Sequence, residues 1–114
     1  MIKFYLTILF TLLISSVASA GEEELLREYF FYRCVNEGHS ELELSEHDGS
    51  AGYSAELLSS SFTTIKMVSN YAKKTAVDIS ASAHGNKKNV LWGCLETYNS
   101  EELKSVISMA VSAK

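Results

Sequence analysis

Apolar residues recur at intervals of three and four along most of the chain beyond residue 20, with polar residues between them. This spacing places side chains on one face of an α-helix, so it predicts amphipathic helices. The predicted buried faces are Leu26, Phe30 and Cys34; Phe62, Ile65, Val68 and Ala72; Val90, Leu91, Cys94, Leu95 and Tyr98; and Leu103, Val106, Ile107 and Ala110. With a short helix after Gly49, they predict an all-α fold, a small bundle of about five helices.

Residues typical of helix ends accompany these faces. Three glutamates at 22–24 precede the first face, where negative charge favours a helix N-terminus, and this helix should end near Gly38. The predicted N-terminal caps of the later helices are Ser50, one of Ser59 to Ser61, and Asn99 or Ser100. Lys73 and Lys74 would occupy the last turn of the helix that begins near Phe62, where cations are favourable.

Two segments lack a helical period. Residues 39–49 are acidic, and the alternation of glutamate and leucine from Glu41 to Ser45 fits a short strand and a helical turn equally well. Residues 75–89 are mostly small and polar, with a turn expected at Gly85 and Asn86, so they predict the longest loop. The chain has no proline and few runs of β-branched residues, which favours helices over a sheet.

The first 20 residues have the pattern of a secretory signal peptide. A lysine near the start precedes an apolar run from Phe4 to Ile14, and Ala18 to Ala20 form a small-residue cleavage site. The run is shorter than the roughly 20 residues that a membrane helix needs. We therefore expect cleavage before Gly21, and a single exported helical domain of residues 21–114 without membrane attachment.

The two cysteines, Cys34 and Cys94, are predicted to form a disulfide, because an exported protein meets an oxidising environment. The bond would close a loop of about 60 residues, and the chain-entropy account gives it roughly 4 kcal/mol of stabilisation. The alternative is a catalytic thiol. Aromatic and aliphatic neighbours surround both cysteines in sequence, and an apolar setting raises a thiol pKa, which disfavours that alternative.

Charge disfavours nucleic acid and anionic lipid as partners. The chain holds ten lysines and arginines against fourteen aspartates and glutamates, and loss of Lys3 with the leader leaves nine, for a formal net charge of minus five. Nucleic acids and anionic membranes select clustered positive charge. The basic pairs at 73–74 and 87–88 are more typical of solvated helix faces than of phosphate sites.

Residues that could carry out chemistry are few. The three histidines lie in predicted loops without a sequence pattern that places a base beside a nucleophile. A metal set would use His39, Glu41, Glu43, His47 and Asp48, but their spacing matches no ligand signature, and a solvated acidic loop is the simpler interpretation. Glycine-rich phosphate motifs are absent from the sequence. We expect no catalytic residue, no metal and no cofactor, and therefore no enzyme.

Four consecutive aromatic residues, 29–32, cannot share one helix face, because each residue turns by about 100° around the axis. Some of these rings must be covered by another element or by another chain. A subunit interface is one interpretation.

Two segments resemble a known family. Asp48 to Tyr53 read DGSAGY before a short helix, and Trp92 to Leu103 read WGCLETYNSEEL. They are similar to the small periplasmic immunity proteins that neutralise type VI secretion amidase effectors, specifically the fourth amidase effector–immunity family. The matching positions in the second segment are Cys94, Glu96, Tyr98, Ser100, Glu102 and Leu103. In the first segment we expect structural roles, with Ser50 as a cap and Gly52 permitting close packing.

The resemblance implies an all-helical homodimer in the periplasm. Its partner would be a toxin amidase of the Cys-His cysteine-peptidase type, which cuts the peptide stems of peptidoglycan. The immunity protein would bind this enzyme and block its substrate groove, so that the cell is protected from its own toxin and from that of its siblings.

The segment from Asp78 to Asn89 is the candidate plug for that groove, from its composition and length alone. The predicted partner-binding residues are Ser80, Ala81, Ser82, His84, Gly85, Asn86 and Lys87. A plain connection between two helices is the alternative. The acidic segment from Glu41 to Asp48 is a second candidate surface, which would steer a basic enzyme.

Two other functions fit the same features. A small periplasmic stress chaperone would also be helical and disulfide-linked, and would protect unrelated proteins from aggregation in acid. An inhibitor of another wall-degrading enzyme, such as lysozyme, would share nearly all of the features. A secreted enzyme is the least favoured class.

Overall fold

The computed structural model describes residues 21–82 and 87–113, and every element in them is helical. The first helix occupies residues 21–38, and the short 3-10 helix η1 (Ser40–Leu42) follows it. The remaining helices are α2 (Leu44–His47), α3 (Ser50–Glu56), α4 (Phe62–Ala81), α5 (Val90–Tyr98) and α6 (Glu101–Ser112). The predicted all-α class is confirmed, while the predicted signal peptide lies outside the described residues.

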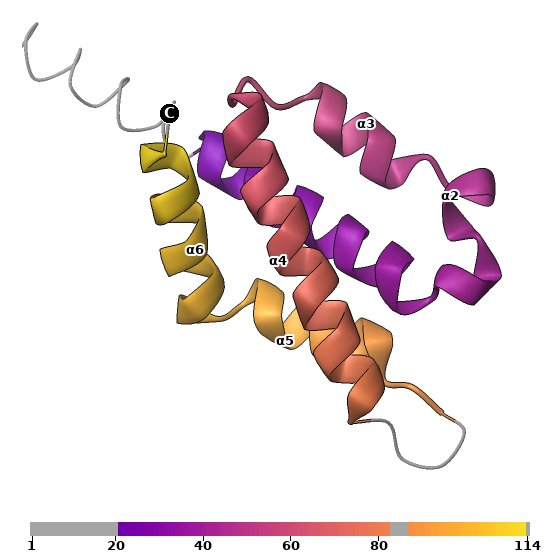
Figure 1. Ribbon diagram of the computed structural model, residues 1–114. Helices are drawn as coiled ribbons and strands as arrows, with labels where there is room; N and C mark the ends of the chain where they lie inside the picture. The colour runs from indigo at the N-terminus through magenta and orange to yellow at the C-terminus, as the bar shows by residue number, and fades with distance from the viewer. Residues whose placement is uncertain (1–20, 83–86, 114) are drawn as a thin grey trace, which may run out of the picture.

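The longest of these labelled helices, α4, crosses the middle of the molecule and contacts both α5 and α6 (Figure 1). The helix of residues 21–38 passes behind α4, while α2 and α3 lie on the side of α4 away from α6 (Figure 1). The helices therefore pack in two layers around one core, as expected for a domain of about 100 residues.

The core confirms the predicted face of the first helix, and it confirms those of α4 and α6 in part, because Phe62 is 78% exposed and Val106 is only partly buried. Leu26, Phe30 and Cys34 are fully buried, and the Phe30 ring lies 5.6 Å from the Tyr71 ring of α4, measured between centroids. The other members of the buried cluster include Val68, Ala72, Val90, Cys94, Leu103, Ile107 and Ala110. These residues come from four helices, so the apolar faces stabilise one another by removing shared surface from water.

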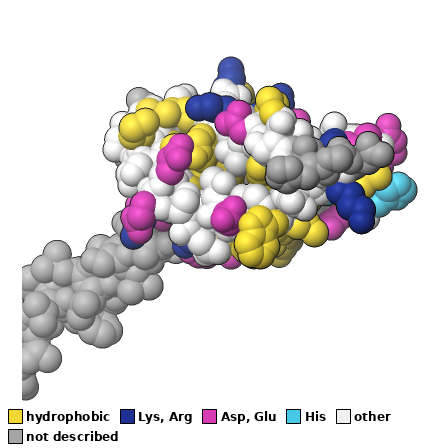
Figure 2. Space-filling model, turned by 90° about the horizontal axis from the view of Figure 1, so that it is seen from below, with side chains coloured by type: hydrophobic (Ala, Val, Ile, Leu, Met, Phe, Trp, Pro, Cys, Tyr) yellow, Lys and Arg dark blue, Asp and Glu magenta, His cyan; other side chains and the backbone are white. Residues whose placement is uncertain are grey.

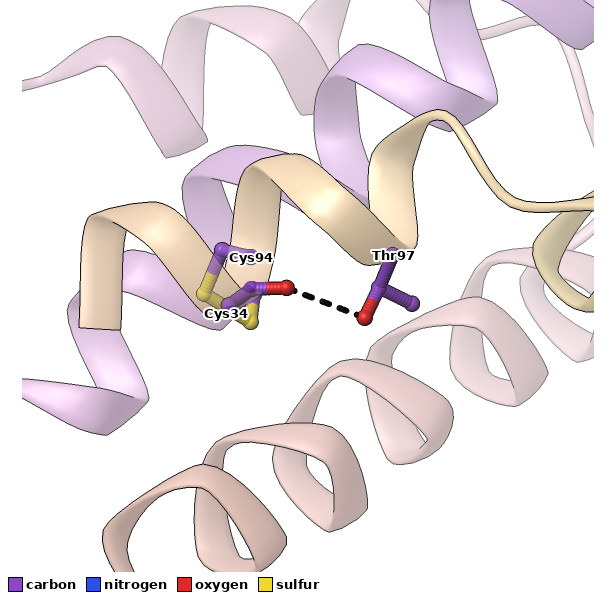
Figure 3. Close-up of a disulfide and its surroundings, with 4 residues drawn as sticks. Cys34, Cys94 and Thr97 are labelled. Atoms are coloured by element: carbon purple, nitrogen blue, oxygen red, sulfur yellow. Dashed lines mark hydrogen bonds between the residues drawn. A yellow bond between two sulfur atoms is a disulfide. The ribbon is translucent and has the colours of Figure 1, made fainter. Parts of the chain in front are cut away.

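The disulfide between Cys34 and Cys94 is present, as predicted, and both residues have no exposed surface. It joins the helix of residues 21–38 to α5, across a sequence separation of 60 residues (Figure 3). Close by on α5, the Thr97 hydroxyl donates a hydrogen bond of 3.0 Å to the Gly93 carbonyl, one turn earlier (Figure 3). The disulfide therefore links two helices that are distant in sequence.

The predicted loop over residues 75–89 is wrong for its first part, because α4 continues to Ala81. Lys73 and Lys74 consequently lie inside α4 and not in its last turn. The small residues mark a packing surface: Ala76 is 2% exposed, and a Cβ on Gly93 of α5 would lie 2.7 Å from the Ile79 side chain. Two helices can approach closely only where their side chains are small. Because loops are also rich in small residues, the composition of this segment resembles that of a loop.

Two of the predicted caps are confirmed. The Ser61 hydroxyl accepts a hydrogen bond from the Thr64 amide at the start of α4, and the Ser100 hydroxyl accepts one from the Leu103 amide at the start of α6. Each bond satisfies a backbone amide that the helix itself leaves without a partner.

The expectations for the DGSAGY segment are wrong in detail. Ser50 does not cap α3 but begins it, and the Asp48 carboxylate accepts hydrogen bonds from the Ser50 amide and hydroxyl at 2.9 and 2.5 Å. No atom lies within 4 Å of a Cβ added at Gly52, so this glycine permits no close packing. In the neighbouring acidic segment, helical turns replace the ambiguous alternation, with Glu43 in the left-handed region at φ 50° between them.

Candidate partner-binding site at the α4–α5 end

The structure distributes the predicted partner-binding residues between a helix and the connection after it. Ser80 and Ala81 are the last two residues of α4, and Ser82 ends the helix, where its hydroxyl donates a 3.0 Å hydrogen bond to the Asp78 carbonyl. Lys87 is exposed shortly before α5. The other predicted residues, His84, Gly85 and Asn86, lie outside the described part of the chain.

The two predicted surfaces meet in the fold. The Lys88 ammonium lies 3.3 Å from the Glu41 carboxylate, which joins the segment before α5 to the acidic segment. A hydrogen bond from its own backbone amide, aided by Lys88, holds the pKa of Glu41 below its usual range. Residues 41–48 are mostly exposed, so their negative charge is available at the surface near Lys88.

A groove that the sequence did not predict lies between α4 and α5. Its volume is about 460 Å³, and the first turn of α6 contributes Glu102 to its lining. The charged and aromatic side chains around it are Tyr71, Lys74, Asp78, Trp92, Glu96 and Glu102. Three carboxylates therefore face one ammonium, so the groove carries net negative charge.

Tyr71 and Glu102, which both line this groove, interact with each other. Burial and the neighbouring Glu102 carboxylate raise the pKa of Tyr71 from 10.0 to about 12. The sequence gives no sign of this pair, since Glu102 is noted only as a matching position of the segment from Trp92 to Leu103. Their proximity follows from the packing of α6 on α4.

This pKa predicts a loss of stability in alkali. Because the folded state holds the Tyr71 proton more tightly than the unfolded state, its contribution is complete below pH 10 and is lost as the pH rises from 10 to about 12. We expect the free energy of unfolding of Y71F to depend less steeply on pH across this interval, as measured by urea denaturation. Y53F, which alters an exposed tyrosine outside the groove, should follow the wild type. Identical pH dependence of Y71F and wild type would contradict the assignment.

The predicted single apolar face of α5 is divided between two sides of the helix. Val90 and Cys94 are buried, as predicted, whereas Leu91 is 60% exposed and Leu95 is 48% exposed. Trp92, the only tryptophan of the chain, is 67% exposed. Figure 2, which views the molecule from below, shows hydrophobic side chains exposed on the surface among acidic ones.

The aromatic run at 29–32 is also divided. Tyr29 and Phe30 are buried in the core, while Phe31 and Tyr32 are half-buried beside α5. The Phe31 ring meets the Tyr98 ring edge-on, with 6.0 Å between centroids. The bundle therefore covers two of the four rings, and the other two border a second groove with Leu95.

In the described residues, no three histidine, cysteine, aspartate or glutamate side chains are grouped as a metal site would require. The same part of the chain has no helix with the length and apolarity needed to cross a membrane. No known protein family, curated protein sequence or solved structure matches the chain.

Proposed function

We propose that this chain is a periplasmic immunity protein that binds a cognate type VI secretion amidase and occludes its active-site groove. In this proposal the chain carries out no reaction. It acts as a homodimer, reaches the periplasm through its cleaved N-terminal segment, and protects the peptidoglycan of the producing cell. The sequence resemblance in residues 48–53 and 92–103 is the starting point.

The observation that supports the proposal most is that five of the six matching positions in the second segment make a defined structural contact, namely Cys94, Tyr98, Ser100, Glu102 and Leu103. Cys94 forms the disulfide, Ser100 caps α6, and Leu103 is fully buried. Burial and then the Glu102 carboxylate raise the pKa of Tyr71, which places Glu102 beside α4, while Glu96 lines the groove. A motif whose residues hold two helices together is the kind that a family keeps for its fold, and this supports a shared architecture.

Tyr98 completes this set through a network with the first helix. Its hydroxyl donates a 2.6 Å hydrogen bond to Glu24, which with burial raises the pKa of Tyr98. The Arg27 guanidinium lies 4.5 Å from the centre of the Tyr98 ring and donates a 2.9 Å hydrogen bond to the Tyr98 carbonyl. The network secures the end of α5, so the surface that α5 presents is preorganised for binding.

Occlusion requires affinity without chemistry. An inhibitor that keeps a toxin silent needs roughly nanomolar affinity, about 12 kcal/mol, from an interface of about 1,600 Å². The exposed end of α4, with Ala81 and Ser82, carries small side chains that suit entry into a narrow enzyme groove. Because this end belongs to a helix that is already ordered, less conformational entropy is lost when it binds.

The test is inhibition of the cognate amidase, which the proposal expects to be a small Cys-His enzyme encoded in an adjacent reading frame. We expect S82R to weaken inhibition by about 100-fold, because an arginine at the tip of α4 would collide with the enzyme groove and leave a buried charge. T63R is the matched control: Thr63 is exposed on the same helix, about 28 Å from Ser82 at 1.5 Å per residue.

Two results would contradict different parts of the proposal. If S82R and T63R inhibit equally well, the contact does not lie at the end of α4. If the wild-type protein neither binds nor inhibits that amidase, the immunity function itself is wrong. Far-UV circular dichroism of both variants verifies that they are folded.

A further inference from the structure

The outer face of α5 forms a ridge whose side chains no described element covers. Val90 and Cys94 anchor the inner face in the core, and Leu91, Trp92 and Leu95 project on the outer face with 60, 67 and 48% of their surface exposed. Buried anchors at both the start and the middle of a nine-residue helix fix the directions of the exposed side chains. The ridge is therefore a preformed surface.

The two flanks of the ridge differ in character. On the α4 side lies the groove with Asp78, Glu96 and Glu102, opposed only by Lys74 among its lining side chains. On the side of the first helix, the second groove is lined by Glu28, Phe31, Tyr32, Leu95 and Tyr98. One flank is thus acidic with an exposed indole at its edge, and the other is aromatic.

We infer that the outer face of α5 binds a segment of the partner protein in which an arginine lies beside an apolar side chain. The arginine enters the α4–α5 groove between Trp92 and the carboxylates of Asp78 and Glu96. The apolar side chain covers Leu91 and Leu95 next to the aromatic flank. This assignment rests on the proposed function for the identity of the partner, but its chemistry follows from the surface itself.

Arginine fits the acidic flank better than the other charged side chains. Its planar guanidinium stacks on an indole and donates paired hydrogen bonds to carboxylates, whereas a lysine ammonium offers a single point charge. An anionic segment would meet the three carboxylates and be repelled.

A second copy of the chain is disfavoured as the occupant. A two-fold contact through α5 would bring the same patch of each copy together, and with it the same carboxylates at Asp78 and Glu96. The proposed homodimer would therefore use another face.

The sole tryptophan makes the site directly observable, because the fluorescence of the protein's indole reports on Trp92 alone. The probes are three capped tetrapeptides that alternate leucine with arginine, lysine or glutamate, titrated into the purified protein at constant ionic strength. We expect the arginine peptide to change the emission and to bind about fivefold more tightly than the lysine peptide, with no response to the glutamate peptide. A missing response to the arginine peptide, or equal responses to all three, would overturn the inference.

Variants in which carboxylates are replaced by neutral amides show where the peptide binds. D78N/E96Q keeps the indole and should weaken binding of the arginine peptide by about tenfold. E23Q/E56Q is the matched control, since it changes the net charge by the same amount, and neither residue lines the α4–α5 groove. Equal affinities of the two double variants would show that the peptide responds to overall charge, which would overturn the site.

Two further measurements separate this inference from the proposed function. If wild type and D78N/E96Q inhibit the cognate amidase equally, the immunity function stands and the α5 site is wrong. If wild type does not inhibit it, the proposed function fails, and the peptide titration still decides the site. Sedimentation of wild type and L95E shows whether α5 mediates self-association. A dimer that L95E dissociates would assign the face to a second copy and overturn the inference.

Discussion

Replacing both cysteines with alanine, as C34A/C94A, is expected to lower the free energy of unfolding by about 4 kcal/mol. The bond joins residues 60 positions apart, so its loss restores a large amount of conformational freedom to the unfolded chain. Small domains have total stabilities of about 5 to 15 kcal/mol, so the variant retains a small margin at best. Urea denaturation followed by circular dichroism measures the difference.

The paired variant C34S/C94S distinguishes the cross-link from the packing of its atoms. Both cysteines are fully buried, so two serine hydroxyls would need partners in an apolar core. We expect a further loss of about 1 to 3 kcal/mol relative to the alanine variant. Equal unfolding midpoints for wild type and C34A/C94A would refute the stabilising role of the disulfide.

Truncation of Phe30 is expected to cost about 3 to 5 kcal/mol of unfolding free energy. The ring is fully buried, stacks at a tilt against Tyr71 and belongs to the cluster that joins the first helix to α4 and α6. In F30A the lost contacts and the cavity add together, because a close-packed interior relaxes only partly. Urea denaturation with the disulfide intact measures this loss.

The neighbouring phenylalanine provides the control. Phe31 is only half-buried and contacts Tyr32 and Tyr98 at the surface, so F31A should cost about half as much or less. If F31A lost as much stability as F30A, this result would contradict the orientation of the first helix, in which Phe30 points into the core and Phe31 lies nearer the surface.

The sequence alone determined the elements and their inward faces where the pattern was regular. Periodicity over 26–34 and 103–110 identified core residues that are now seen buried, and serine chemistry located the caps of α4 and α6. These features are local, because one turn of helix sets both the face and the cap. The cysteine pairing was also determined, since two cysteines allow a single connectivity.

The sequence was misleading where small residues have two explanations. Ala76 is buried in the bundle and α4 continues to Ala81, yet small residues such as those after Thr75 are also typical of a loop, so the sequence predicts the end of α4 too early. Likewise, Leu91 and Leu95 matched the period of a buried face but lie outward on α5. Periodicity identifies an apolar stripe, but the neighbours of a helix decide which part of its surface is covered.

Only the tertiary structure decided the candidate site. Asp78, Trp92 and Glu102 lie on three helices and surround one groove, and their spacing in sequence gives no sign of it. Lys88 likewise meets Glu41 across 47 positions. A chain's pattern specifies which surfaces avoid water, whereas the juxtaposition of charged side chains depends on how those surfaces pack, and that packing is set by contacts between residues far apart in sequence.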